Sequence, residues 1–145
     1  MNSRLPVLFL FALVFSQVAY GQKTKPDSGA YTPAKGSAER QAILDTLRDV
    51  LNDQQVVFKV HYLKVHNGWC WVDTTPLDKQ GRATAEGGAN LLHLQNGKWM
   101  VMDLSKVPDD PKDPMGAEDA SPGFIKNLMK TYPGVPRDIF PKLTR

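Results

Sequence analysis

Two Asn-Gly pairs, Asn67-Gly68 and Asn96-Gly97, narrow the range of folds open to this chain more than any other feature. Asn-Gly is the strongest short-range signal for a two-residue hairpin turn when strand-forming residues flank it. Such residues flank both pairs, as "QQVVFKVHYLKVH" before the first pair and as "NLLHL" and "WMVMDL" around the second. Two hairpins in succession predict an antiparallel meander of at least four strands.

A helix is predicted ahead of this meander, in "SAERQAILDTLRDVL". Ser37 is a favourable N-cap, and Glu39 places negative charge near the positive end of the helix dipole. Apolar side chains recur at positions i, i+4, i+7 and i+8 and form one stripe of Ile43, Leu47, Val50 and Leu51. The predicted fold class is therefore α+β, with this helix packed on the antiparallel sheet over residues 37–104.

The N-terminal segment has the order of a secretory signal. Arg4 is followed by the apolar run "LPVLFLFALVF" and then by small residues near "VAYG". We therefore expect a signal peptide over residues 1–21, export to the periplasm or the exterior, and no membrane span after cleavage, because the apolar run is shorter than the roughly 20 residues that cross a bilayer. Residues 22–36 are polar and rich in Pro and Gly, which predicts a flexible leader.

The segment 105–145 differs from the rest because it contains seven of the eleven prolines. Most of it is predicted to be irregular. One short helix is expected after Ser121 as N-cap and Pro122 at the first helical position, with an apolar side of Phe124, Ile125, Leu128 and Met129. Ile139 and Phe140 are unusual in a solvated tail, so we expect them to dock on the domain, with docking on a partner as the alternative.

Net charge and cysteine content exclude some classes of protein. A formal charge of +3, spread evenly, does not indicate a nucleic-acid partner. The single cysteine, Cys70, allows no intrachain disulfide, so the fold depends on its core. No short ligand spacing of His or Cys is present, and we expect no metal and no cofactor.

A two-residue turn at Asn67-Gly68 fixes which residues share a face. It pairs Val65 with Cys70 and Lys64 with Trp71, so the thiol faces away from both neighbouring indoles. Apolar neighbours disfavour a thiolate, which predicts a buried and inert Cys70. A reactive thiol or an intermolecular disulfide through Cys70 is the alternative.

The remaining candidate chemistry rests on a few side chains. Trp69, Trp71, Tyr62 and Lys64 are predicted to share one face, where they would form an aromatic binding platform. The competing interpretation is that the tryptophans cover the helix stripe together with Phe58 and Val60. A catalytic pair of Cys70 and His61 is excluded, because His61 lies four residues along the strand from Val65, the residue opposite Cys70. At about 3.3 Å per residue this is roughly 13 Å, whereas a nucleophile and its base need about 3 Å. His93 is the one histidine that the predicted register does not exclude as a general base for Cys70.

Three stretches resemble a group of small exported bacterial proteins of unknown function: "GSAERQAILDTLR", "VVFKVHYLKVHNGWCWV" and "LLHLQNGKWMVMDL". The shared features are a capped helix, a "GW" strand and a "GKW-V" strand. The resemblance implies no activity. In outline, a helix on a curved antiparallel sheet is similar to the cystatin-like and NTF2-like folds, and fold alone does not fix function.

Together these features predict an exported, non-catalytic domain that binds a protein, a peptide or a small envelope ligand. One alternative is an enzyme with a pocket under the C-terminal tail that uses Cys70 and His93. The other is a structural subunit that forms a homodimer through Cys70 or a strand edge.

Overall fold

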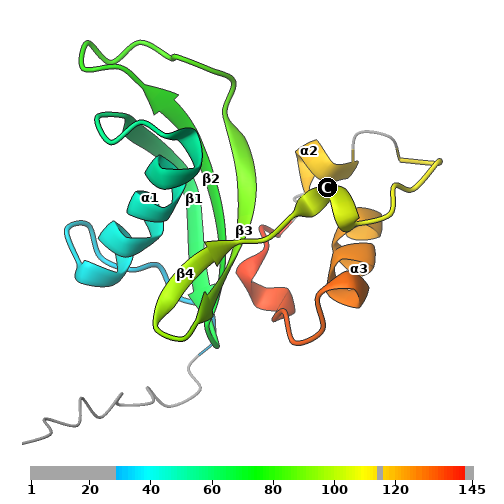
Figure 1. Cartoon of the computed structure of the whole chain (residues 1–145). Helices are drawn as coiled ribbons and strands as arrows, with labels where there is room; N and C mark the ends of the chain where they lie inside the picture. The colour runs from blue at the N-terminus through cyan, green and yellow to red at the C-terminus, as the bar shows by residue number, and fades with distance from the viewer. Residues whose placement is uncertain (1–28, 114–115, 143–145) are drawn as a thin grey trace, which may run out of the picture.

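The computed structural model describes residues 29–113 and 116–142, so the predicted signal peptide and residues 22–28 lie outside the described part. The fold is α+β, as predicted: one helix, four antiparallel strands in the order β1-β2-β3-β4, and a C-terminal helix (Figure 1). Its elements are α1 (Ala38–Leu51), β1 (Val57–His66), β2 (Trp69–Leu77), β3 (Gly88–Gln95), β4 (Lys98–Val101), η1 (Leu104–Lys106), α2 (Gly116–Asp119), α3 (Pro122–Thr131) and η2 (Arg137–Ile139).

Both predicted Asn-Gly turns are present. Asn67 and Gly68 have φ angles of 48° and 74°, and Asn96 and Gly97 have 49° and 78°. Positive φ at both central positions is the type I′ geometry, whose twist matches that of the flanking strands. The first turn sets the predicted register, with Val65 opposite Cys70. Cys70 and Trp71 therefore point to opposite faces of the sheet.

A β-bulge in β1 changes the expected assignment of faces. Val60 pairs with Thr74 but Tyr62 pairs with Asp73, so His61 is an additional residue with no partner of its own in the ladder. The extra residue reverses the alternation on either side of it. Phe58 and Val60 therefore pack with Cys70, and the prediction that they share a face with Tyr62 and the tryptophans was wrong.

Helix α1 covers the face of the sheet that carries Cys70, called here the helix face. Its N-cap is Ser37, whose hydroxyl accepts a hydrogen bond from the Arg40 N–H. The buried contact is made by Ile43, Leu44 and Leu47 of α1 and by Leu63, Val65, Cys70, Val72, Leu92 and Trp99 of the strands. The predicted stripe was wrong at its C-terminal end, because Val50 and Leu51 are 64% and 47% exposed.

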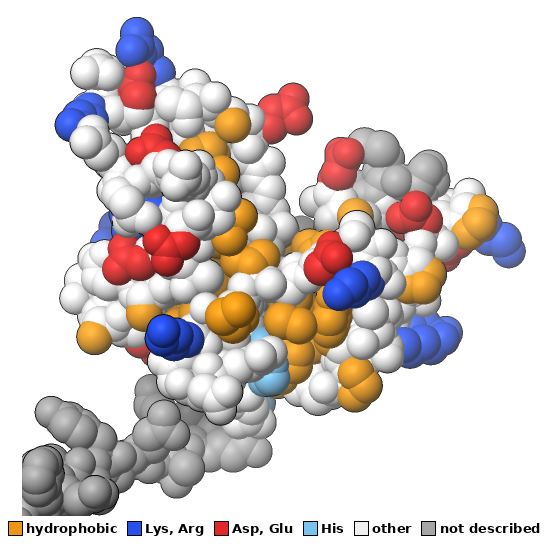
Figure 2. All heavy atoms as spheres, in the orientation of Figure 1, with side chains coloured by type: hydrophobic (Ala, Val, Ile, Leu, Met, Phe, Trp, Pro, Cys, Tyr) orange, Lys and Arg blue, Asp and Glu red, His pale blue; other side chains and the backbone are white. Residues whose placement is uncertain are grey.

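The C-terminal segment covers the opposite face, called here the tail face. Ser121 caps α3 and accepts a hydrogen bond from the Phe124 N–H, as predicted. The buried cluster on this face combines Trp69, Trp71 and Leu91 of the sheet with Val107, Ala120, Phe124, Ile125, Leu128, Val135, Ile139 and Phe140. The sheet is thus buried on both faces in a three-layer arrangement. Figure 2 shows hydrophobic side chains gathered between the α1 half and the α3 half.

The described part of the predicted flexible leader, residues 29–36, lies against the edge of β1. Tyr31 and Val65 exchange two backbone hydrogen bonds of 3.0 and 2.8 Å, and the Tyr31 hydroxyl donates to the Glu39 carboxylate. The Thr32 hydroxyl donates to the Leu63 carbonyl. Tyr31 and Thr32 of the predicted leader therefore cover the edge of β1 at Leu63 and Val65 and protect that stretch from other strands.

Candidate functional site

The structure does not form the predicted aromatic platform. Trp69 and Trp71 do share a face, but they are only 6% and 1% exposed. Trp69 stacks on His93 with ring centroids 3.8 Å apart, and Trp71 packs against Phe140 at 5.0 Å. The two indoles are core residues, which confirms the competing interpretation in their burial, but that interpretation was wrong about their cover, which is the C-terminal tail and not α1.

Cys70 is a core residue, which confirms the predicted burial. Its side chain has no exposed surface and packs under α1. Burial, with a smaller contribution from the Glu39 charge, raises the pKa of the thiol far above its usual value. Because the thiolate is the nucleophilic form, we expect Cys70 to react slowly in the folded protein. A disulfide through Cys70 requires that the helix face be opened.

The pair of Cys70 and His93 does not form. Cys70 pairs with Leu92 across the β2–β3 ladder, whereas His93 pairs with Trp69 and stacks on it. His93 therefore lies on the tail face and Cys70 on the helix face. Among residues 29–113 and 116–142, no group of three or more His, Cys, Asp and Glu side chains has the geometry to hold a metal ion. No helix in these ranges is long and apolar enough to span a bilayer.

Tyr62 and Lys64, the two other predicted site residues, line a cavity of about 700 Å³ between β1 and the tail. This "basic cavity" is completed by Ala30, Arg137, Asp138, Phe140 and Lys142. Burial and the Asp138 charge raise the pKa of Tyr62, so its hydroxyl is protonated at neutral pH. The cavity thus brings together two of the four residues proposed for the platform, while the tryptophans lie beneath the tail.

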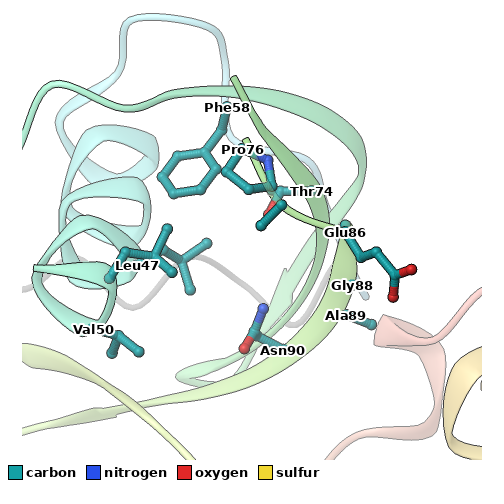
Figure 3. A pocket seen from close by; sticks show the side chains of 12 residues that line it. Leu47, Val50, Phe58, Thr74, Pro76, Glu86, Gly88, Ala89 and Asn90 are labelled. Atoms are coloured by element: carbon teal, nitrogen blue, oxygen red, sulfur yellow. The ribbon is translucent and has the colours of Figure 1, made fainter. Parts of the chain in front are cut away.

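A second cavity lies on the helix face, at the C-terminal end of α1 (Figure 3). It has a volume of about 240 Å³. Leu47 and Val50 of α1 form one wall, and Phe58 points toward them from β1 (Figure 3). The described residues that line this "α1 pocket" are Leu47, Val50, Leu51, Phe58, Thr74, Pro76, Ala85, Glu86, Gly87, Gly88, Ala89 and Asn90.

The α1 pocket results from the sizes of side chains along two strands. Successive pairs of β2 and β3 on the helix face are Cys70 with Leu92, Val72 with Asn90, and Thr74 with Gly88. The last pair presents a small hydroxyl and no side chain at all, while α1 continues above it to Leu51. A Cβ atom added at Gly88 would meet no heavy atom within 4 Å. The missing side chain of Gly88 therefore leaves the hollow.

Two polar groups stand in this mostly apolar lining. Thr74 is 4% exposed, yet its hydroxyl forms no side-chain hydrogen bond with another described residue, and neither does the Asn90 amide. The Asn90 side chain extends from the sheet toward α1, while Glu86 points away from the hollow (Figure 3). An apolar hollow with a few polar groups is the usual composition of a small-ligand site.

Sequence reasoning missed the α1 pocket. Two signals were present: Val50 and Leu51 continue the apolar stripe beyond the sheet residues that can cover it, and "EGGAN" places glycines at the start of a strand. Comparison with known proteins adds no assignment, because no family model, no curated protein and no solved structure matches the chain.

Proposed function

We propose that this protein is an exported, non-catalytic binding domain that takes a small, mainly apolar ligand in the α1 pocket. The observation that carries the proposal is the polar pair of Thr74 and Asn90, without side-chain partners among the described residues, in a mainly apolar hollow. Both polar groups reach solvent, because no fully buried side-chain nitrogen or oxygen atom among the described residues lacks a hydrogen-bond partner. A ligand in the pocket therefore replaces water as their hydrogen-bond partner. The signal-like order of residues 1–21 supports export.

The size and chemistry of the α1 pocket define the ligand class. A volume of about 240 Å³ is below the usual range of drug-sized sites, which begins at about 300 Å³. The ligand is therefore one aromatic or branched aliphatic group, held between Leu47 and Phe58. It carries a hydrogen-bonding group, because the Asn90 amide and the Thr74 hydroxyl can each donate and accept.

The lining also supports binding in preference to catalysis. Among the described lining residues, Glu86 alone has a titratable side chain, and that side chain is exposed and points away from the hollow. General acid–base and nucleophilic catalysis require such groups within hydrogen-bond reach of the substrate. The thiol of Cys70 lies deeper in the core and does not line the pocket.

The experiment is a titration of the isotope-labelled protein with indole and indene, followed by amide NMR shifts. The two probes have the same shape, but only indole carries an N–H donor. Shifts are expected at Gly88, Asn90 and the end of α1, with tighter binding of indole. Gly88→Leu places a side chain in the hollow without backbone strain and should abolish binding of both probes. Val57→Leu, at an exposed position outside the pocket, is the matched control.

Asn90→Leu separates the polar contribution from shape. This substitution should lower the affinity for indole roughly 3- to 10-fold, which corresponds to the loss of one neutral hydrogen bond, and should leave the affinity for indene unchanged. The proposal is wrong if neither probe binds at millimolar concentration, or if Gly88→Leu binds indole as the unmodified protein does.

A further inference from the structure

The basic cavity on the tail face carries a second inference, independent of the α1 pocket. Its walls come from two parts of the chain that are far apart in sequence. Tyr62 and Lys64 stand on β1, and Arg137 and Phe140 belong to the tail, where η2 packs against β1 and β2. The cavity of about 700 Å³ is therefore formed only when the tail is docked.

The charges in this cavity are unbalanced. Lys64, Arg137 and Lys142 contribute three positive charges, and within the described ranges none of the three forms an ion pair. The one carboxylate, Asp138, is already engaged. It accepts hydrogen bonds from the Ala30 N–H at 2.9 Å and pairs with His66 Nδ1 at 2.8 Å. In the part of the chain that the structure describes, three cations thus face one carboxylate, and that carboxylate is engaged elsewhere.

The guanidinium of the exposed Arg137 contacts an aromatic ring of the core. It lies over the Phe140 ring, 5.9 Å from the ring centroid, and Phe140 is itself 2% exposed and packed on Trp71. Stacking of this kind orients a guanidinium and leaves its N–H donors available for a ligand. Tyr62, half-buried in the opposite wall, offers a hydroxyl as a further donor.

An adjoining hollow extends the positive potential along β1. It is lined in part by Lys35 and Arg40 and shares Tyr62 and Lys64 with the basic cavity. Clustered charge of one sign in a concave surface raises the local concentration of a ligand of opposite charge. The field therefore favours an anion over a neutral molecule throughout this side of β1.

We propose that the basic cavity binds a small soluble phosphate monoester, with its phosphate between Lys64, Arg137 and Lys142. A phosphate dianion offers three acceptor oxygens and accepts bidentate hydrogen bonds from a guanidinium, whereas a carboxylate offers two oxygens and one charge. The volume leaves room for an organic group beside Tyr62 and Phe140. This site is separate from the α1 pocket, so either one can fail without the other.

The test is isothermal titration of the purified protein with glycerol 3-phosphate, inorganic phosphate and acetate at low salt. Both phosphates should bind, acetate should bind at least about tenfold more weakly, and added salt should weaken all binding. Lys64→Gln and Arg137→Gln should each reduce phosphate affinity by roughly tenfold or more. Lys98→Gln makes the same charge change on β4, outside the cavity, and should leave affinity within about twofold.

A charge-conserving variant and a vesicle control distinguish specific phosphate binding from a general effect of charge and from lipid binding. Arg137→Lys retains the charge and should give an affinity between those of the unmodified protein and Arg137→Gln, because a lysine does not bind phosphate bidentately. If Arg137→Gln unfolds, Lys64→Gln carries the test. Absence of phosphate binding at millimolar concentration overturns the proposal. An equal loss in Lys98→Gln, or binding only to phosphatidylglycerol vesicles and not to glycerol 3-phosphate, overturns it as well.

Discussion

Ile139→Ala tests whether the C-terminal tail is part of the core or an appendage on it. Ile139 has no exposed surface and belongs to the buried cluster that covers Trp71. Truncating a fully buried Ile to Ala removes transfer free energy and leaves a cavity, which together cost about 2–5 kcal/mol. Ile139→Val removes a single methylene and should cost about 0.5–1.5 kcal/mol. The expected result is a graded loss in the free energy of unfolding across the two variants.

The assay is urea unfolding followed by tryptophan fluorescence and far-UV circular dichroism. If the tail is integral to the core, both probes should report the same single transition for every variant. A loss of 2 kcal/mol or more is a large fraction of the roughly 5–15 kcal/mol that stabilises a small domain. Val57→Ala, at a position that is 49% exposed, should change stability by less than about 0.5 kcal/mol. A cost below about 1 kcal/mol for Ile139→Ala, or separate transitions for the two probes, would refute the assignment of the tail to the core.

Two other predictions follow from burial and charge. Cys70 is fully buried and the pKa of its thiol is raised. It should therefore react with a thiol reagent at least roughly 10³-fold more slowly in the folded protein than in denaturant. Fast labelling of the folded protein would contradict the position of Cys70 under α1. Burial acts to raise the pKa of Asp138, but hydrogen bonds from His66 and the Ala30 N–H outweigh it and hold the pKa below its usual value. The stability from this carboxylate is therefore present above about pH 4, the pKa of an unfolded Asp, and is lost as the pH falls through the lower folded pKa. Asp138→Asn should lose less stability than the unmodified protein between pH 5 and pH 2 in urea titrations, and an equal loss would contradict the pairing with His66.

The parts of the fold predicted well from sequence are those set by local chemistry. Asn67-Gly68 fixes the turn, the turn fixes the register, and the register places Cys70 opposite Val65. Ser121 as a helix cap acts within three residues of itself. Each of these features depends on neighbours in the chain, which a sequence displays directly.

The errors concern what lies on each face of the sheet. A single extra residue at His61 reverses the alternation in β1, and no residue type in "FKVHYL" marks the bulge. Both faces of β2 are apolar in "WCWV", so the pattern does not distinguish the face covered by α1 from the face covered by the tail. That choice is made by contacts with residues far away in the chain, such as Phe140 on Trp71.

The same limit applies to the candidate sites. Tyr62 and Lys64 were selected from sequence as part of an exposed aromatic face, whereas their partners in the basic cavity, Arg137 and Lys142, lie in the tail. The α1 pocket depends on the absence of a side chain at Gly88. It also depends on α1, which continues beyond its buried contacts with the sheet. A hollow of this kind depends on three elements together, so the sequence of any one element gives little indication of it.

The covering of Trp69 and Trp71 by the tail also constrains how the protein is made. The meander is synthesised before α3 and η2, so the growing chain carries a completed tail face before it carries the residues that bury it. Ala30 adds a second dependence, since its N–H is bound by Asp138, 108 residues later. While the ribosome still holds η2, the domain cannot close, and the nascent sheet presents two indoles to any chaperone nearby.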